Sequence, residues 1–151
     1  NEQKYDEAID ILEPLADKKT RYRGNVLFEL GRAYESKGQQ ALRENEHEKA
    51  VEYLEKAYTH YAKTEEVPGE QIESREQIDV LRQIIDAHYG TKDYGKMADA
   101  ARRWLELEPG NEEAKRMLQM ATKAEKGLQR QTQPSESAKQ PEKDEKSSKQ
   151  E

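Results

Sequence analysis

The sequence contains no cysteine. A disulfide framework, a thiol nucleophile and a thiolate metal site are therefore excluded for this chain. The absence of cysteine fits several cellular compartments and selects none of them. Candidate chemistry must come from other residue types.

Long hydrophobic runs are also missing. No apolar stretch approaches the ~20 residues that a helix needs to cross a bilayer, and no signal peptide is readable. We therefore expect a soluble piece without a membrane segment.

The first residues of the chain are interpreted below as lying inside a repeat unit. We therefore expect a processed product or an excised piece of a longer protein, whose upstream signal or anchor would lie outside it. The compartment stays open.

Positive charge is in deficit, and the net charge is −6. Binding to a phosphate backbone requires a basic surface, so nucleic acid is not expected as a partner. Charged residues make up 38% of the chain and hydrophobic residues 32%. This balance suits one domain built as a thin layer of helices better than a thick globular core.

The clearest pattern is an apolar stripe at helical spacing within residues 92–114. The stripe recurs every three or four positions: Met97, Ala100, Ala101, Trp104 and Leu105. Asp93 should open this helix, and Pro109 with Gly110 should end it. Asn111 should cap the helix that follows. One helix pair cannot bury such a stripe alone, so further units of the same kind are expected.

Residues 92–111 resemble the second half of the tetratricopeptide repeat (TPR), a unit of two antiparallel helices. Lys92-Asp93-Tyr94 and the segment 105–111, LELEPGN, match its pattern. Ala101 and Trp104 exchange the usual large-then-small order, a swap that conserves volume. The resemblance implies an all-α solenoid of antiparallel helix hairpins, with about two and a half repeats and a capping helix.

The rest of the chain is interpreted as further units. Pro14 should kink or shorten the first helix, Gly31 should let the paired helix approach closely, and Gly38 should end the second helix. These units form one helical domain over 1–128, and the polar residues 129–151 are expected to be disordered. The expected segments are a helix over 4–19, a helix over 22–38, a connection over 39–48, a helix over 50–61, a turn over 67–69, a helix over 70–90 and a capping helix over 112–128.

The histidines do not have the spacing of a metal site. His47-Glu48 begins like the zinc motif HExxH, but Val51 holds the position of the second histidine. His60 and His88 fall on different units. No Gly-rich phosphate loop and no catalytic triad is readable. We therefore expect a protein that is not an enzyme and that uses no metal or other cofactor.

In TPR proteins the functional surface is the concave groove lined by the first helices, which holds an extended peptide or a helix of a partner. Phe28 and Arg32 stand where chaperone-binding members have the lysine and asparagine of a carboxylate clamp, which weakens that specialised use. Arg32, Arg82 and Arg116 can still pair with carboxylates, or they are ordinary surface charges of a solenoid. Position by position, the resemblance implies a groove formed by Asn25, Phe28, Arg32, Arg82, Asp86, Tyr89 and Arg116, with Glu35, Asp79, Glu113 and Met120 beside them.

Two functions remain open. The first is a non-catalytic scaffold or adaptor that binds a peptide or a helix of a partner protein in the groove. The second is a structural assembly module that forms homo-oligomers through its incompletely covered N-terminal repeat. The partner cannot be named from the sequence.

Overall fold

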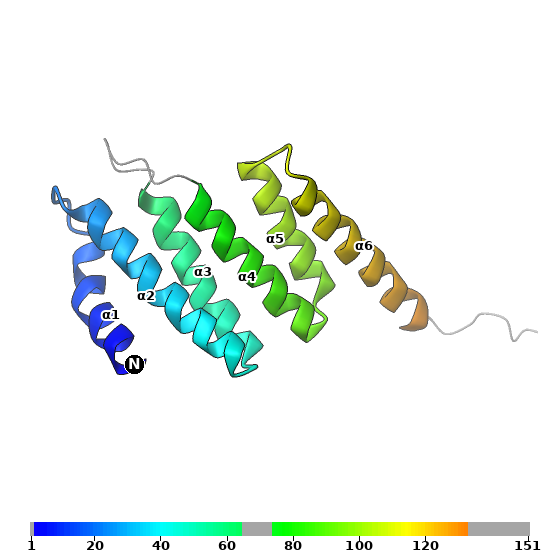
Figure 1. Cartoon of the computed structure of the whole chain (residues 1–151), viewed down its shortest axis with the longest axis horizontal. Helices are drawn as coiled ribbons and strands as arrows, with labels where there is room; N and C mark the ends of the chain where they lie inside the picture. The colour runs from blue at the N-terminus through cyan, green and yellow to red at the C-terminus, as the bar shows by residue number, and fades with distance from the viewer. Residues whose placement is uncertain (1, 65–73, 133–151) are drawn as a thin grey trace, which may run out of the picture.

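The computed structural model describes residues 2–64 and 74–132, and within them the only regular elements are helices. The all-α expectation is confirmed for this part of the chain. No helix in it is long and apolar enough to span a membrane. The helices are α1 (Glu2–Ala16), α2 (Arg23–Arg43), α3 (His47–Thr64), α4 (Arg75–Thr91), α5 (Tyr94–Leu107) and α6 (Glu112–Thr132) (Figure 1).

The described helices stand side by side in one row, and each runs antiparallel to the one before it (Figure 1). Packing follows the chain: every helix contacts its successor, and α2 also contacts α4. As a result, α2, α4 and α6 run in one direction and α1, α3 and α5 in the other. The terminal helices α1 and α6 lie at opposite ends of the row.

The core is a continuous layer of apolar side chains that extends along the row from Ile9 to Ala121. Leu30 and Leu54 are 0% exposed and Trp104 is 2% exposed, as their positions in the helical stripes predict. The indole Nε1 of Trp104 donates a hydrogen bond to Glu108 at 3.2 Å, which satisfies its only polar atom. For these three residues, the helical periodicity of the sequence therefore predicted burial correctly.

Two glycines in α2 mark places where α3 comes unusually close. A Cβ atom at Gly31 would lie 2.5 Å from Cε1 of Tyr61, which confirms the predicted close approach. The prediction that Gly38 ends the helix is wrong, because α2 continues to Arg43. A Cβ atom at Gly38 would lie 2.6 Å from Cγ of Leu54. Gly38 is therefore a second point of helix contact and not a helix stop.

The expected long connection over 39–48 is also wrong, since only residues 44–46 separate α2 from α3. The chain turns at Asn45, whose φ of 60° lies in the left-handed region that asparagine tolerates better than most residues. The amide of Glu46 then donates to the carbonyl of Ala41 at 2.8 Å. Asn45, and not Gly38, provides the helix stop.

The predicted start of α5 at Asp93 and the predicted cap of α6 at Asn111 are confirmed. The carboxylate of Asp93 accepts a hydrogen bond from the amide of Lys96 at 3.2 Å. The side-chain oxygen of Asn111 accepts one from the amide of Ala114 at 2.9 Å. Each cap satisfies an amide that the first turn of a helix leaves without a partner.

Three boundaries differ from the expected ones. Helix α1 ends at Ala16 instead of residue 19, and Pro14 lies inside its last turn. Helix α6 continues to Thr132, into the segment expected to be disordered, because no proline occurs between residue 112 and Pro134. The turn over 67–69, the start of the helix predicted from residue 70 and the rest of the tail lie outside the described residues.

Candidate functional site

The exposed sides of α2, α4 and α6 form one face, which we call the first-helix face. Its residues are tied together by polar contacts that cross from helix to helix. The amide of Gln83 on α4 donates to Glu35 on α2 at 2.8 Å. The guanidinium of Arg82 on α4 pairs with Glu113 on α6 at 3.1 Å. The three helices therefore present a connected surface.

Between α4 and α6 this face contains a small cavity of about 100 Å³. Arg82, Asp86 and Glu113 surround it, and its walls include Trp104 and Met117. The guanidinium of Arg82 lies 5.7 Å from the centre of the Trp104 ring. Arg82 therefore already contacts the carboxylate of Glu113 and the ring of Trp104 within the protein, and its charge is not unpaired.

The carboxyl group of Asp86 has a pKa above its usual range. The main cause is burial, which disfavours the charged form. Arg82 opposes this shift, and the negative charge of Glu113 adds to it. Around the cavity, Arg82 and Glu113 therefore offset each other's charge, and burial disfavours the charged form of Asp86.

Glu35 is the polar centre of the middle of the face. Besides Gln83, its carboxylate accepts hydrogen bonds from the hydroxyl of Tyr61 at 2.9 Å and from Gln39 at 3.2 Å. Burial and the neighbouring Glu35 charge raise the pKa of Tyr61. Glu35 on α2 therefore bonds to Tyr61 on α3 and to Gln83 on α4. Its carboxylate stabilises the packing of these three helices and does not contact a partner.

At the other end of the face, Arg32 lines a hollow of about 310 Å³ between α1 and α2. Tyr5 and Glu29 line the same hollow, and Arg32 lies 3.4 Å from Glu29 in an exposed ion pair.

Phe28 is half-buried, and the centre of its ring lies 5.7 Å from the centre of the Tyr61 ring. Phe28 therefore contributes to packing as well as to the surface.

The remaining candidates are spread along the face. Asn25 lies in the first turn of α2, and Tyr89, which is 56% exposed, lies in the last turn of α4. Because α2 and α4 run in the same direction (Figure 1), these two residues are at opposite ends of the face. Arg116 on α6 is exposed. The seven predicted residues share a face but do not converge on one pocket.

Sequence reasoning missed the contact that connects the face. Gln83 and Glu35 are 48 positions apart, and no sequence motif pairs them. Their pairing depends on the register between α2 and α4, which no local pattern encodes. No local signal in the sequence identifies this pair.

The histidines occupy packing positions. His47 lies against Gly90, the ring of His60 stacks on Tyr34 at 5.6 Å and 7°, and His88 is buried. Burial lowers the pKa of both His60 and His88. In the described part of the chain, no group of three or more His, Cys, Asp or Glu residues is placed to hold a metal ion.

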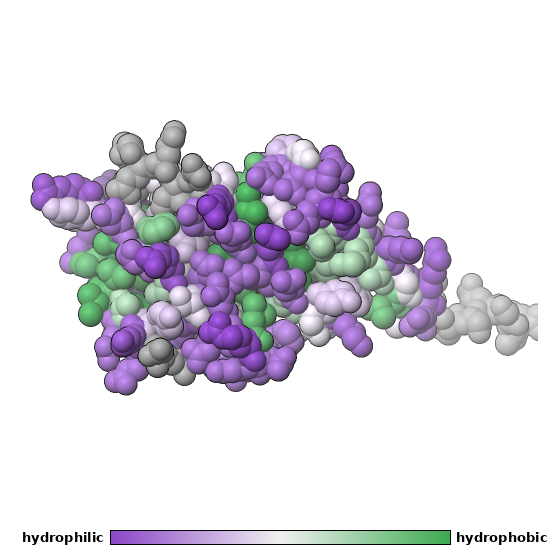
Figure 2. Space-filling model, in the orientation of Figure 1, coloured by the Kyte–Doolittle hydropathy of each residue, from purple (hydrophilic) through white to green (hydrophobic). Residues whose placement is uncertain are grey.

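Surface hydropathy separates the end of the row from its middle. Figure 2 shows mainly hydrophilic residues over the central helices and a gathering of apolar residues over α1. Ile11 on α1 is 68% exposed, although isoleucine is among the residues most often buried.

Comparison of the chain with family models, with curated proteins and with solved structures finds no match.

Proposed function

We propose that this protein is a non-catalytic scaffold with a TPR-like solenoid architecture, and that it binds an extended segment of a partner protein along the first-helix face. The observation that carries the proposal is the continuity of this face. Contacts of Gln83 with Glu35 and of Arg82 with Glu113 fix α2, α4 and α6 side by side. A rigid, elongated and polar surface suits a linear segment better than a small molecule.

The chemistry of the face indicates which segment it would take. Arg82 and Glu35 are already paired within the protein, so they do not recognise a partner's charges. Tyr89 and Arg116 are exposed at the α4 and α6 part of the face. An aromatic ring and a guanidinium together favour a partner segment that carries an aromatic or carboxylate side chain.

The test replaces these two exposed residues together, as Tyr89→Ala/Arg116→Glu. Proteins captured from a lysate by the wild type are identified, and binding of the identified partner is then measured with the purified variant. We expect at least a tenfold loss of affinity, since the loss of a charge-assisted contact and an aromatic contact costs more than ~1.4 kcal/mol. Circular dichroism of the variant should match the wild type, because both side chains are exposed.

The matched control is Arg102→Glu, an exposed charge reversal on α5, outside the first-helix face. It should leave binding of the partner unchanged. Equal losses in the control and in the double variant would assign the effect to net charge. Unchanged binding by Tyr89→Ala/Arg116→Glu would rule out this face as the binding site.

A further inference from the structure

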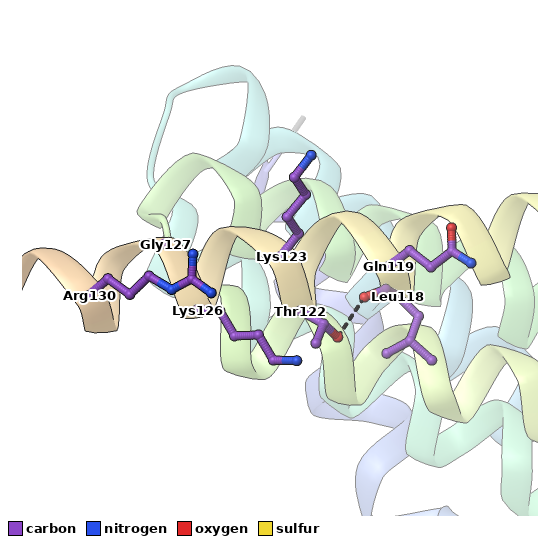
Figure 3. A pocket seen from close by; sticks show the side chains of 7 residues that line it. All are labelled: Leu118, Gln119, Thr122, Lys123, Lys126, Gly127 and Arg130. Carbon is purple, nitrogen blue, oxygen red and sulfur yellow. Dashed lines mark hydrogen bonds between the residues drawn. The ribbon is translucent and has the colours of Figure 1, made fainter.

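One side of α6, the last described helix of the row (Figure 1), contains an open hollow of about 610 Å³. Three cations line this α6 hollow, Lys123, Lys126 and Arg130, together with uncharged residues that include Leu118 and Thr122. Figure 3 shows the side chains of Leu118, Thr122 and Lys126 on the same side of the helix. No carboxylate is among the described residues that line the hollow. The hollow is therefore positively charged, whereas the whole chain has a net charge of −6.

The acidic residues of α6 do not offset this charge, because their side chains lie elsewhere. Glu112 pairs with Lys115 at 2.7 Å in the first turn of the helix. Glu113, beside it, pairs with Arg82 of α4 at 3.1 Å. A carboxylate oxygen of Glu125 faces the first turn of α5, where a Cβ atom added to the glycine would lie 3.2 Å from it.

The cations of the hollow have no such partners. Lys123, Lys126 and Arg130 are exposed, and none of their side chains forms an ion pair or a hydrogen bond with another described residue. By contrast, Lys56 on α3 pairs with Glu52 one turn away, at 3.3 Å. The positive charges of the α6 hollow are therefore available to an anionic group from outside these helices.

The lining of the hollow also differs from a surface that belongs to the core of the row. When Leu118 on α6 is matched with Leu30 on α2, Lys126 takes the place of Gly38. Gly38 is buried, and a Cβ atom there would lie 2.6 Å from Cγ of Leu54 on α3. A charged and exposed lysine cannot pack in this way. The α6 hollow is thus a polar binding surface in its own right, and its charge comes from the residues of α6 themselves.

The chemistry and shape of the hollow indicate what it would bind. The side chains of Leu118 and Thr122 and the methylene stems of the lysines provide apolar area, while the ammonium groups remain at the edge in water. Lys123, Lys126 and Arg130 follow one another about one helical turn apart, a rise of ~5.4 Å. A helix that lies along α6 can repeat its carboxylates at the same spacing. A flat bilayer does not fill a concave hollow, and the net negative charge of the chain repels the polyanionic backbone of nucleic acid.

We propose that the α6 hollow binds an amphipathic, acidic helix of a partner protein. The apolar residues of that helix contact Leu118 and Thr122, and its carboxylates, one turn apart, pair with Lys123, Lys126 and Arg130. Charge complementarity of this kind selects the partner more than it adds affinity. The interaction does not depend on the proposed function, because the first-helix face and the α6 hollow are different surfaces.

The experiment uses two synthetic helical peptides as probes. They have the same length and the same leucine face, and one carries glutamates beside the leucines where the other carries lysines. Fluorescence anisotropy measures the binding of each labelled peptide to the full chain. We expect the glutamate peptide to bind about tenfold more tightly, because it forms ion pairs where the lysine peptide makes like-charge contacts. The net charge of −6 alone would favour the lysine peptide, so this preference is diagnostic, and added salt should weaken it.

A charge exchange identifies the surface. Lys123→Glu/Lys126→Glu should lose the glutamate peptide and gain the lysine peptide. The matched control is Lys18→Glu/Lys19→Glu, which changes two exposed lysines in the connection between α1 and α2 and alters the net charge by the same amount. It should bind the peptides like the wild type. Tyr89→Ala, on the first-helix face, should also leave this binding unchanged, and circular dichroism confirms that each variant is folded.

Several results would overturn the proposal. One is a wild type that binds neither peptide or prefers the lysine peptide. Another is a preference that Lys123→Glu/Lys126→Glu leaves unchanged, or that the control reverses equally. Tighter binding of phosphatidylserine vesicles or of duplex DNA than of the glutamate peptide would assign the hollow to a different class of anion. Binding that appears only after removal of residues 133–151 would assign the hollow to a segment of the chain itself.

Discussion

Arg103 of α5 donates two hydrogen bonds to Glu55 of α3, at 2.7 and 2.9 Å. The carbon at the centre of its guanidinium lies 4.2 Å from the centre of the Tyr58 ring. This two-point contact joins helices that do not follow one another in the chain. On the first-helix face, Gln83 and Glu35 join α4 to α2 in a similar way. Both sides of the row are therefore braced between non-consecutive helices.

The first prediction concerns this brace. Arg103→Ala and Glu55→Ala, alone and combined, form a double-mutant cycle, and we expect a coupling energy of ~1 kcal/mol from urea unfolding. The value is modest because both side chains are partly exposed to water. Arg103→Lys should recover only part of the stability, since an ammonium group cannot donate in the planar two-point geometry. Additive effects of the two alanine changes would show that the brace contributes no coupling.

The second prediction concerns Trp104, whose side chain is almost completely buried in the core. Trp104→Ala should lower the free energy of unfolding by ~3–5 kcal/mol, because it removes a large aromatic group and leaves a cavity. Leu107→Ala, at a half-buried position on the same helix, should cost clearly less. A loss below ~1 kcal/mol for Trp104→Ala would contradict its burial.

The buried faces could be predicted from the sequence because they repeat at helical spacing, as in Met97, Ala101 and Trp104. The start of α5 at Asp93 and the cap of α6 at Asn111 could be predicted because both residues act within one turn. The end of α2 could not, because Gly38 fits two roles equally well: a helix stop and a point of close contact. Only the position of Leu54 across the helix pair decides between them.

The candidate site was predicted less completely than the fold. Periodicity places Arg82 on an exposed side of α4, but it does not reveal that Glu113 already neutralises it. Similarly, Phe28 is readable as a surface residue, whereas its contact with Tyr61 depends on how α2 and α3 pack. Side-chain partners from different helices depend on register, and a single sequence does not encode register locally.

The third prediction compares two glycines in helices. Gly31→Ala should lower the free energy of unfolding by ~1–3 kcal/mol, because the new methyl group overlaps the buried Tyr61 ring. Gly127→Ala on α6 meets no atom within 4 Å. It should raise the free energy of unfolding by roughly 0.5–1 kcal/mol through better helix propensity. Urea denaturation of both variants measures the contrast, and the same sign of change in both would contradict the assigned role of Gly31.

The last prediction concerns pH and His60. Burial lowers the pKa of His60, with Lys63 adding to the effect and Glu13 opposing it. The unfolded chain therefore binds a proton at this residue more readily than the folded chain does. Its contribution to stability is complete above the usual histidine pKa of about 6.5 and is lost as pH falls below it.

His60→Phe should reduce this loss of stability between neutral and mildly acidic pH. The replacement keeps a ring that can stack on Tyr34 and removes a buried Nδ1 atom that has no hydrogen-bond partner, so stability at neutral pH should be unchanged or higher. Part of the acid sensitivity should persist, because burial also lowers the pKa of His88. Urea denaturation of both proteins at a series of pH values measures the difference. An identical pH dependence in the two proteins would mean that His60 is equally basic in the folded and unfolded chains.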